Sequence, residues 1–264
     1  MRMTQREILQ TALRQSAVDC SCTEDDFLRD GPVVVESKEA EGASRYLDTP
    51  QICALFSYGA NIVAACRKDL VSEVTRYVNE TKTIYNCFDP PRLDELNRIL
   101  LKKAEARVTW MHTFYLPEPE LVFGAKLSCP YETREMHPED FRDLYKPEWG
   151  NALCKDRKEL DMLGVGALDG DRLIGLAACS ADCADMWQIG IDVLPAYRRK
   201  GVASALTNQL ARRIFDQGKV PFYAAAWANL RSVRNGLRSG FRPAWTVLTA
   251  KKGDSPGEKE ENRP

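Results

Sequence analysis

This sequence contains few histidines and no long apolar run. It contains two histidines, His112 and His137, and its nine cysteines include no Cys-x-x-Cys pair. Zinc sites in proteins are built from such ligands at close, regular spacing. We therefore expect no metal. The odd number of scattered cysteines predicts reduced, mostly buried thiols.

No stretch of the chain approaches the roughly 18–20 consecutive apolar residues that a bilayer-spanning helix needs. Residues 1–7 continue into an amphipathic pattern rather than into the apolar core of a signal peptide. We therefore expect a cytoplasmic protein without a membrane partner.

An excess of charge of either sign is also missing. The 37 basic and 38 acidic residues give a formal net charge of −1. This balance excludes a general electrostatic attraction to nucleic acid, so no nucleic-acid partner is expected. Any anionic ligand must be held by a local cluster of positive charge instead.

The first half of the chain alternates predicted helices and strands. Apolar residues recur at helical spacing over residues 4–13, over residues 67–79 and in a segment that opens at Asp89. Apolar runs predict strands at Val33–Val35, Ile52–Phe56 and Val108–Tyr115. This alternation predicts an α/β domain over residues 1–120 with a core of its own.

The strongest boundary signal is the segment 116–119, which places two prolines and an acid between apolar runs. We expect a second domain over residues 125–252. The last segment, residues 253–264, has no apolar residue to bury, and we expect a flexible tail there.

The second half of the chain predicts a sheet with flanking helices. Asp169-Gly170 is a hairpin signal, since both residue types tolerate positive φ. Strands are predicted over residues 131–136, 162–168, 172–179, 187–193, 222–227 and 245–250. Helices are predicted over residues 138–145, 201–217 and 232–239.

The most informative segment is the apolar strand 187–193 with the basic turn and helix that follow it. The turn carries three cationic side chains and Gly201, and it opens directly into the helix. Such a layout directs unpaired backbone N–H groups and the positive end of a helix dipole at one point. That point is suited to a pyrophosphate.

The turn reads Arg198-Arg-Lys-Gly201-Val-Ala203, and it resembles the Arg/Gln-x-x-Gly-x-Gly/Ala element by which GNAT N-acetyltransferases hold acetyl-coenzyme A. The resemblance extends over roughly residues 130–250. It implies an α/β fold with a mixed, mostly antiparallel twisted sheet, flanking helices and an additional N-terminal α/β domain. It also implies acetyl-coenzyme A as cosubstrate. The cofactor-binding residues expected in and beside the turn are Ile191, Val193, Arg198, Arg199, Lys200, Gly201, Val202, Ala203 and Ser204.

The resemblance further implies that strand 187–193 diverges from its parallel neighbour, strand 222–227. The pantetheine arm of the cosubstrate would lie between the two strands, where backbone groups of Ile191 to Val193 pair with its amides. The N–H near Val193 would polarise the thioester carbonyl. The acceptor amine would attack the thioester directly, without a covalent enzyme intermediate.

A second element, residues 229–241, resembles the Asn-x-x-Ala/Ser-x-x-x-Tyr-x-x-x-Gly-Phe ending of the family. Asn229 and Ser232 fit it and are expected at the cofactor site, although Asn229 is equally explained as a helix cap. The tyrosine that often protonates the departing thiolate in relatives falls at Gly236 here. The residue for that role is therefore left open.

The general base is also left open. Gln188 stands where many relatives carry glutamate, and it can hydrogen-bond but cannot accept a proton. Asp192 shares the strand face of Gln188. Asp192 is therefore a candidate base. The favoured interpretation, however, is that Asp192 is a structural residue in a salt bridge.

Together these features predict an enzyme that moves an acetyl group onto a primary amine, with a small molecule favoured over a protein N-terminus as acceptor. The first half of the chain either forms one side of the acceptor groove or is a degenerate copy of the second half. The alternative is a catalytically inactive module that binds coenzyme A. The identity of the acceptor, the length of the acyl group and the existence of a homodimer stay open.

Overall fold

The computed structural model describes residues 3–253, which fall into two compact units. Unit 1 comprises residues 3–11 and Tyr115–Pro243, and unit 2 comprises Ala12–Phe114 and residues 244–253. The helix α1 (Gln5–Cys20) and the strands β4 (Ala106–Pro117) and β10 (Phe241–Lys252) run from one unit into the other.

This division differs from the expected domains at both ends of the chain. The expected boundary at 116–119 lies next to the change of unit within β4, but residues 244–252 belong with the first-half unit rather than with the second. The reason is strand pairing, because Thr246–Ala250 of β10 pair with β2 (Cys53–Ser57). A strand's apolar pattern does not reveal its partner. The predicted tail beyond Gly253 lies outside the described residues.

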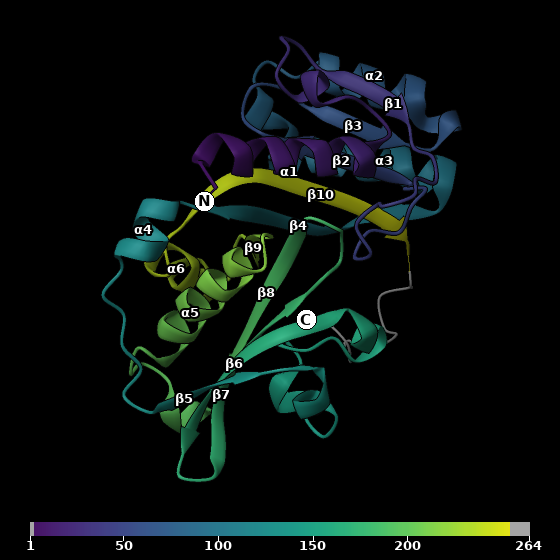
Figure 1. Ribbon diagram of the computed structural model, residues 1–264. Helices are drawn as coiled ribbons and strands as arrows, with labels where there is room; N and C mark the ends of the chain where they lie inside the picture. Colours follow the sequence, from purple (N-terminus) through teal and green to yellow (C-terminus); the bar gives the residue numbers. More distant parts are fainter. Residues whose placement is uncertain (1–2, 254–264) are drawn as a thin grey trace. The chain divides into compact units, whose positions relative to one another are not determined.

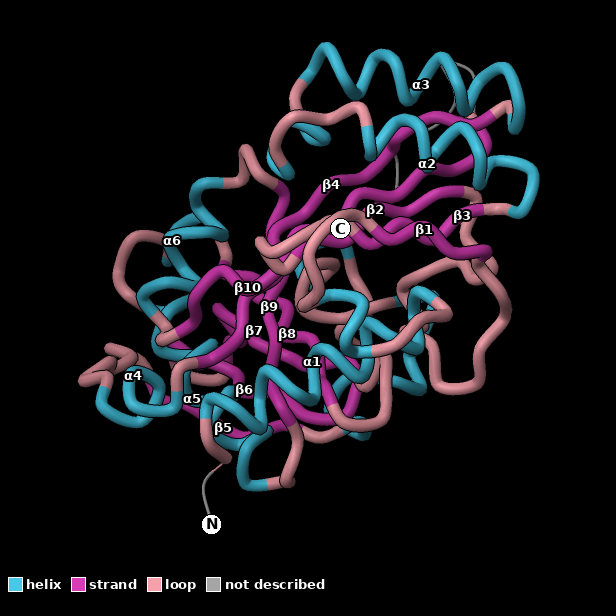
Figure 2. The backbone as a smooth tube through the Cα atoms, turned by 90° about the horizontal axis from the view of Figure 1, so that it is seen from above, coloured by secondary structure: helices cyan, strands magenta, loops and turns pink. Residues whose placement is uncertain are grey.

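In unit 2 the sheet order is β1 (Val33–Glu36), β3 (Val63–Cys66), β2, β10, β4. β1 and β3 are parallel, while β2 is antiparallel to both β3 and β10. The helices α2 (Val71–Asn79) and α3 (Pro90–Ala104) lie side by side on this sheet, as Figure 2 shows, and they enclose one apolar core. The sequence analysis did not predict β3.

In unit 1 the sheet order is β9, β8, β7, β6, β5 (Figure 1). The pairs β5–β6, β6–β7 and β7–β8 are antiparallel and β8–β9 is parallel, so the predicted mixed, mainly antiparallel sheet is confirmed. The bounds of the strands are β5 Glu132–Met136, β6 Asp161–Asp169, β7 Arg172–Ser180, β8 Met186–Val193 and β9 Val220–Ala226.

Three helices belong to unit 1, namely α4 (Pro119–Gly124), α5 (Val202–Asp216) and α6 (Leu230–Arg238). The helix predicted over 138–145 is a short 3-10 turn, Pro138–Phe141. The other 3-10 turns are Glu24–Phe27, Lys68–Leu70, Ile84–Phe88, Pro147–Trp149, Lys155–Leu160 and Pro195–Tyr197.

The helix α5 is the main support of the sheet in unit 1. Its apolar stripe, Val202, Leu206, Leu210 and Ile214, packs with buried residues of β6 to β9. Arg212 and Asn208 on α5 donate to the Val122 carbonyl at the end of α4, with N···O distances of 2.9 Å each for Nη2 and Nδ2. α5 is thus fixed on both sides, which sets the position of its N-terminus.

The opposite face of β8 is covered by the segment 149–153. Asp192 of β8 accepts hydrogen bonds from the Asn151 N–H at 2.8 Å, the Asn151 Nδ2 at 2.7 Å and the Ala152 N–H at 2.9 Å. A Cβ at Gly190 would stand 1.8 Å from the Asn151 carbonyl oxygen. Glycine at 190 therefore permits the close approach that the Asp192 hydrogen bonds require.

Gly190→Ala should displace this segment and lower the free energy of unfolding by about 3 kcal/mol, because backbone atoms must shift to admit the methyl group. The matched control is Gly124→Ala, where an added Cβ has no atom within 4 Å. Thermal and urea unfolding of both variants measure the difference. Equal stability of the two variants would contradict this packing.

Candidate functional site

β8 and β9 are parallel neighbours that pair over only part of their length. Their pairing runs from Met186–Val220 to Ile189–Tyr223 and ends there. β8 continues to Val193 and β9 to Ala226. The two strands therefore stop pairing beyond Ile189, as the resemblance implies, and we call the unpaired stretch of β8 and β9 beside the basic turn the gap.

The backbone groups that face this gap follow from the alternation along β8. The Leu194 N–H donates to the Ile174 carbonyl of the β7 side at 3.0 Å. Since successive residues of a strand direct their N–H and C=O groups to opposite sides, Ile191 and Val193 direct theirs toward the gap. β9 no longer pairs with either residue. Their N–H groups are thus available to an added strand-like ligand.

The turn after β8 is shaped by two residues with positive φ, Arg199 at 64° and Gly201 at 84°. Gly201 is the N-cap of α5, and its carbonyl accepts the first hydrogen bond of the helix, from Ala205 at 3.1 Å. The N–H groups of Val202, Ala203 and Ser204 therefore have no acceptor within the helix.

No backbone N–H from Arg199 through Ser204 donates a hydrogen bond within the part of the chain that the structure describes. A Cβ at Gly201 would meet no atom within 4 Å, so the space in front of the turn is open. Consecutive free N–H groups at the positive end of a helix form an anion site. The predicted pyrophosphate turn thus has the required backbone geometry.

The cationic side chains of the turn are held by unit 1 itself. Arg198 donates through Nε to the Val193 carbonyl at 2.8 Å. Lys200 donates through Nζ to the Tyr131 hydroxyl at 3.1 Å and lies 5.4 Å from the Tyr197 ring centroid. These contacts keep two positive charges beside the open N–H groups. Arg199 is exposed.

Three other residues expected at the cofactor use their side chains differently. The hydroxyl of Ser204 donates to the Asn235 Oδ1 at 3.0 Å, so only the Ser204 N–H faces the anion site. Asn229 accepts from the Ser232 N–H at 3.1 Å and is the N-cap of α6, which supports the capping interpretation. The Ser232 hydroxyl lies 2.6 Å from the Tyr223 hydroxyl.

The structure argues against Asp192 as a general base. Its carboxylate receives the three hydrogen bonds from Asn151 and Ala152, and burial raises its pKa while these bonds oppose the rise. The favoured structural interpretation is supported, but the partners are amides rather than the cation of a salt bridge. Gln188, half-buried between Ser180 and Phe222, has no group that accepts a proton.

A buried acidic pair that the sequence did not indicate lies at the start of β6. Asp161 accepts from the Tyr145 hydroxyl at 3.2 Å and the Cys154 N–H at 3.1 Å. Burial raises the pKa of Asp161 to about 7. Asp182, 3.1 Å from Arg157 Nε, contributes like-charge repulsion. Only the tertiary fold brings these residues together, because none shares a local motif.

The described residues hold no group of three or more His, Cys, Asp and Glu side chains arranged for a metal ion. All nine cysteines are free thiols, and six of them are buried. Among residues 3–253 no helix has both the length and the apolar character to span a bilayer.

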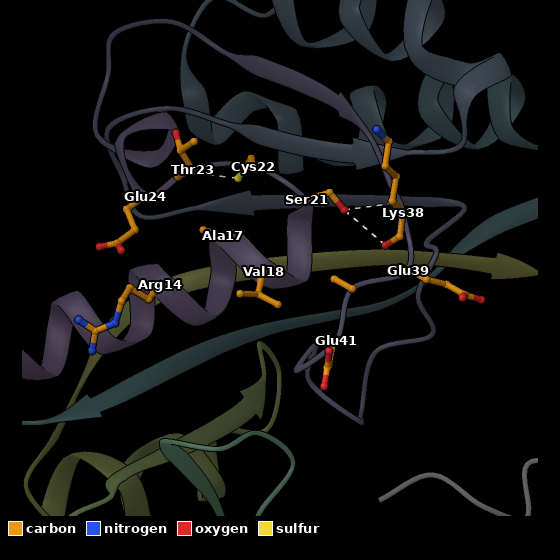
Figure 3. A pocket seen from close by; sticks show the side chains of 11 residues that line it. Arg14, Ala17, Val18, Ser21, Cys22, Thr23, Glu24, Lys38, Glu39 and Glu41 are labelled. Carbon is orange, nitrogen blue, oxygen red and sulfur yellow. Dashed lines mark hydrogen bonds between the residues drawn. The ribbon is translucent and has the colours of Figure 1, made fainter.

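Unit 2 has a groove of about 670 Å³ along the second half of α1. Arg14 and Lys38 line it together with the acids Glu24, Glu39 and Glu41. Figure 3 shows that Lys38, Glu39 and Glu41 point in different directions, and two of its dashed lines join Ser21 to the Lys38 backbone. Because no charged groups converge on one point, the groove offers no comparable ligand site.

Comparison with known proteins gives one sequence match. Residues 130–241 match the family model described as "Acetyltransferase (GNAT) family". No curated protein sequence is significantly similar to the chain. The matched residues all lie in unit 1 and include the gap, the basic turn and α6.

Three solved structures illustrate the fold comparison. A GCN5-related N-acetyltransferase-like protein from Streptococcus suis is 17% identical, with 62% of this chain and 69% of that chain covered and a TM-score of 0.44. A GNAT-family acetyltransferase from Colwellia psychrerythraea is 16% identical, with 61% and 62% covered and a TM-score of 0.39. Aminoglycoside N-acetyltransferase AAC(6')-Iy in complex with CoA is 22% identical, with 46% and 93% covered and a TM-score of 0.35.

The raised pKa of Asp161 has a consequence for stability. An unfolded aspartate titrates near 3.9, so between about pH 4 and pH 7 the folded protein keeps a proton that the unfolded chain releases. The free energy of unfolding should therefore fall as the pH rises through this window, by about 4 kcal/mol in all.

Asp161→Asn should remove this dependence and stabilise the protein at pH 8 relative to wild type. Urea unfolding at pH 4 and pH 8 measures it, with Asp171→Asn at the exposed hairpin turn as control. A variant that keeps the wild-type pH slope would show that Asp161 is ionised throughout.

Proposed function

We propose that the chain is an acyltransferase of the kind described by the acetyltransferase (GNAT) family model, which residues 130–241 match, and that it transfers an acetyl group from acetyl-coenzyme A to a primary amine. The observation that carries the proposal is the run of free N–H groups from Arg199 to Ser204 beside the gap between β8 and β9.

The pyrophosphate of the cosubstrate fits the basic turn. Its oxygens accept several hydrogen bonds at once, and the N–H groups of Lys200 to Ser204 can supply them at short range because Gly201 carries no side chain. Arg198 and Lys200 add positive charge from the flanks. Both are anchored, so little side-chain entropy is lost when the ligand binds.

The pantetheine arm carries two amides and resembles an extended peptide. In the gap it would pair with the backbone groups of Ile191 and Val193 as an added strand. The N–H near Val193 would polarise the thioester carbonyl, which becomes more negative as the amine attacks. Positioning and electrostatics would supply most of the acceleration.

The acceptor nitrogen must lose a proton, and neither Asp192 nor Gln188 is suited to take it. An amine with a pKa near 8 needs only modest assistance, which water leading to bulk solvent can give. A small molecule is the favoured acceptor, because the sequence carries no evident acidic stripe for a basic peptide. Gln188 would hydrogen-bond the acceptor or that water.

Two observations favour a second function, a coenzyme A-binding module without catalysis. The carboxylate of Asp192 is fully engaged, and Gly236 stands where a tyrosine would be expected. Release of free thiol from acetyl-coenzyme A across a panel of amines separates the two. Turnover with any amine supports the transferase, whereas tight binding in calorimetry without turnover supports the module.

Gly201→Glu should raise the Kd for acetyl-coenzyme A at least 100-fold, because the new carboxylate occupies and repels the pyrophosphate position. Gly218→Glu is the matched control. Gly218 also has positive φ, at 70°, and open space at its Cβ, but it lies after the other end of α5. Calorimetry measures both. Equal affinities in the two variants would remove the turn from the binding site.

A further inference from the structure

Tyr223 is a buried hydroxyl-bearing residue at the point where the gap begins. It forms the last pair between β9 and β8, opposite Ile189. Beyond it β9 consists of Ala224, Ala225 and Ala226, whose small side chains leave room beside the gap. The Tyr223 ring itself packs in the core under α5 and is 2% exposed.

The hydroxyl of Tyr223 reaches the first turn of the helix that follows β9. It lies 2.6 Å from the Ser232 hydroxyl, in the first turn of α6, which follows the C-terminal end of β9. Ser232 is only partly buried. The hydroxyl pair therefore stands at the boundary between the core and the opened strands.

Gly236 of α6 makes room for this tyrosine. A Cβ at position 236 would lie 3.2 Å from the Tyr223 Cδ1, so the ring would have to shift by a few tenths of an ångström, and 3.5 Å from its Cε1, an ordinary contact. The Tyr223 ring therefore packs tightly against Gly236 of α6.

We propose that the Tyr223 hydroxyl donates a hydrogen bond to the sulfur of coenzyme A as the thioester bond breaks. In that step the carbon–nitrogen bond forms, the carbon–sulfur bond breaks and its electron pair stays on sulfur. A donor aimed at the new negative charge stabilises the transition state more than the ground state. The thiolate then takes up, through solvent, the proton that the acceptor nitrogen releases, which balances the reaction.

The protonation state of Tyr223 agrees with a donor role. Burial raises its pKa, hydrogen bonds from Ser232 and Asn235 oppose the rise, and the charge of Asp192 on β8 raises it further. The phenol thus stays protonated at neutral pH.

This inference rests on the proposed transferase function, and it is tested with Tyr223→Phe in the full chain. Thiol release from acetyl-coenzyme A with an amine that wild type accepts should fall about 100-fold in kcat, the typical loss when one such donor is removed. The KM for acetyl-coenzyme A should stay within twofold, because the ring and the gap are retained.

Tyr115→Phe is the matched control. Tyr115 lies in the same core, 6.3 Å from the Tyr223 ring centroid in an edge-to-face contact, and is 3% exposed. Its kcat should stay within twofold of wild type. A Tyr223→Phe variant that melts like wild type and keeps its kcat would overturn this assignment alone. Failure of wild type itself to release thiol with any amine would instead overturn the proposed function.

Discussion

The early end of hydrogen bonding between β8 and β9 is the constraint on which the site depends. A parallel pair gains a ladder of backbone bonds for every residue that it keeps in register, and a buried unpaired N–H costs about 1–3 kcal/mol. The two strands nevertheless stop pairing after Ile189 and Tyr223. Something in unit 1 must hold β8 away from β9.

Contacts on both sides of β8 account for this separation. On one face Asp192 anchors the segment 149–153, and Gly190 lets that segment approach closely. On the other face Ile189 and Val193 pack with α5, whose own position is fixed by Arg212. Arg198 then satisfies the Val193 carbonyl from within the turn. The gap is therefore part of the folded structure before any ligand arrives.

Much of this arrangement could be predicted from the sequence, because it is local. The strand, the basic turn and the helix follow one another within residues 186–216, and Gly201 marks the positive φ that the turn needs. The unit to which residues 244–252 belong could not be predicted, since it depends on pairing with a strand almost 200 positions earlier. The same holds for the partner of Asp192 and for the buried pair Asp161 and Asp182. Tyr223 was noted only as a residue of the strand next to pantetheine, because its relation to Gly236 requires the packing of α6 on β9.

Hydrogen–deuterium exchange with and without coenzyme A tests the central claim most directly, because it reads the individual amides on which the account depends. We expect exchange at Arg199–Ser204, Ile191 and Val193 to slow at least tenfold when coenzyme A is bound. The Leu194 amide, already bonded to Ile174, serves as the internal reference. Binding of coenzyme A that leaves these amides unprotected, while others in the chain slow, would contradict the account.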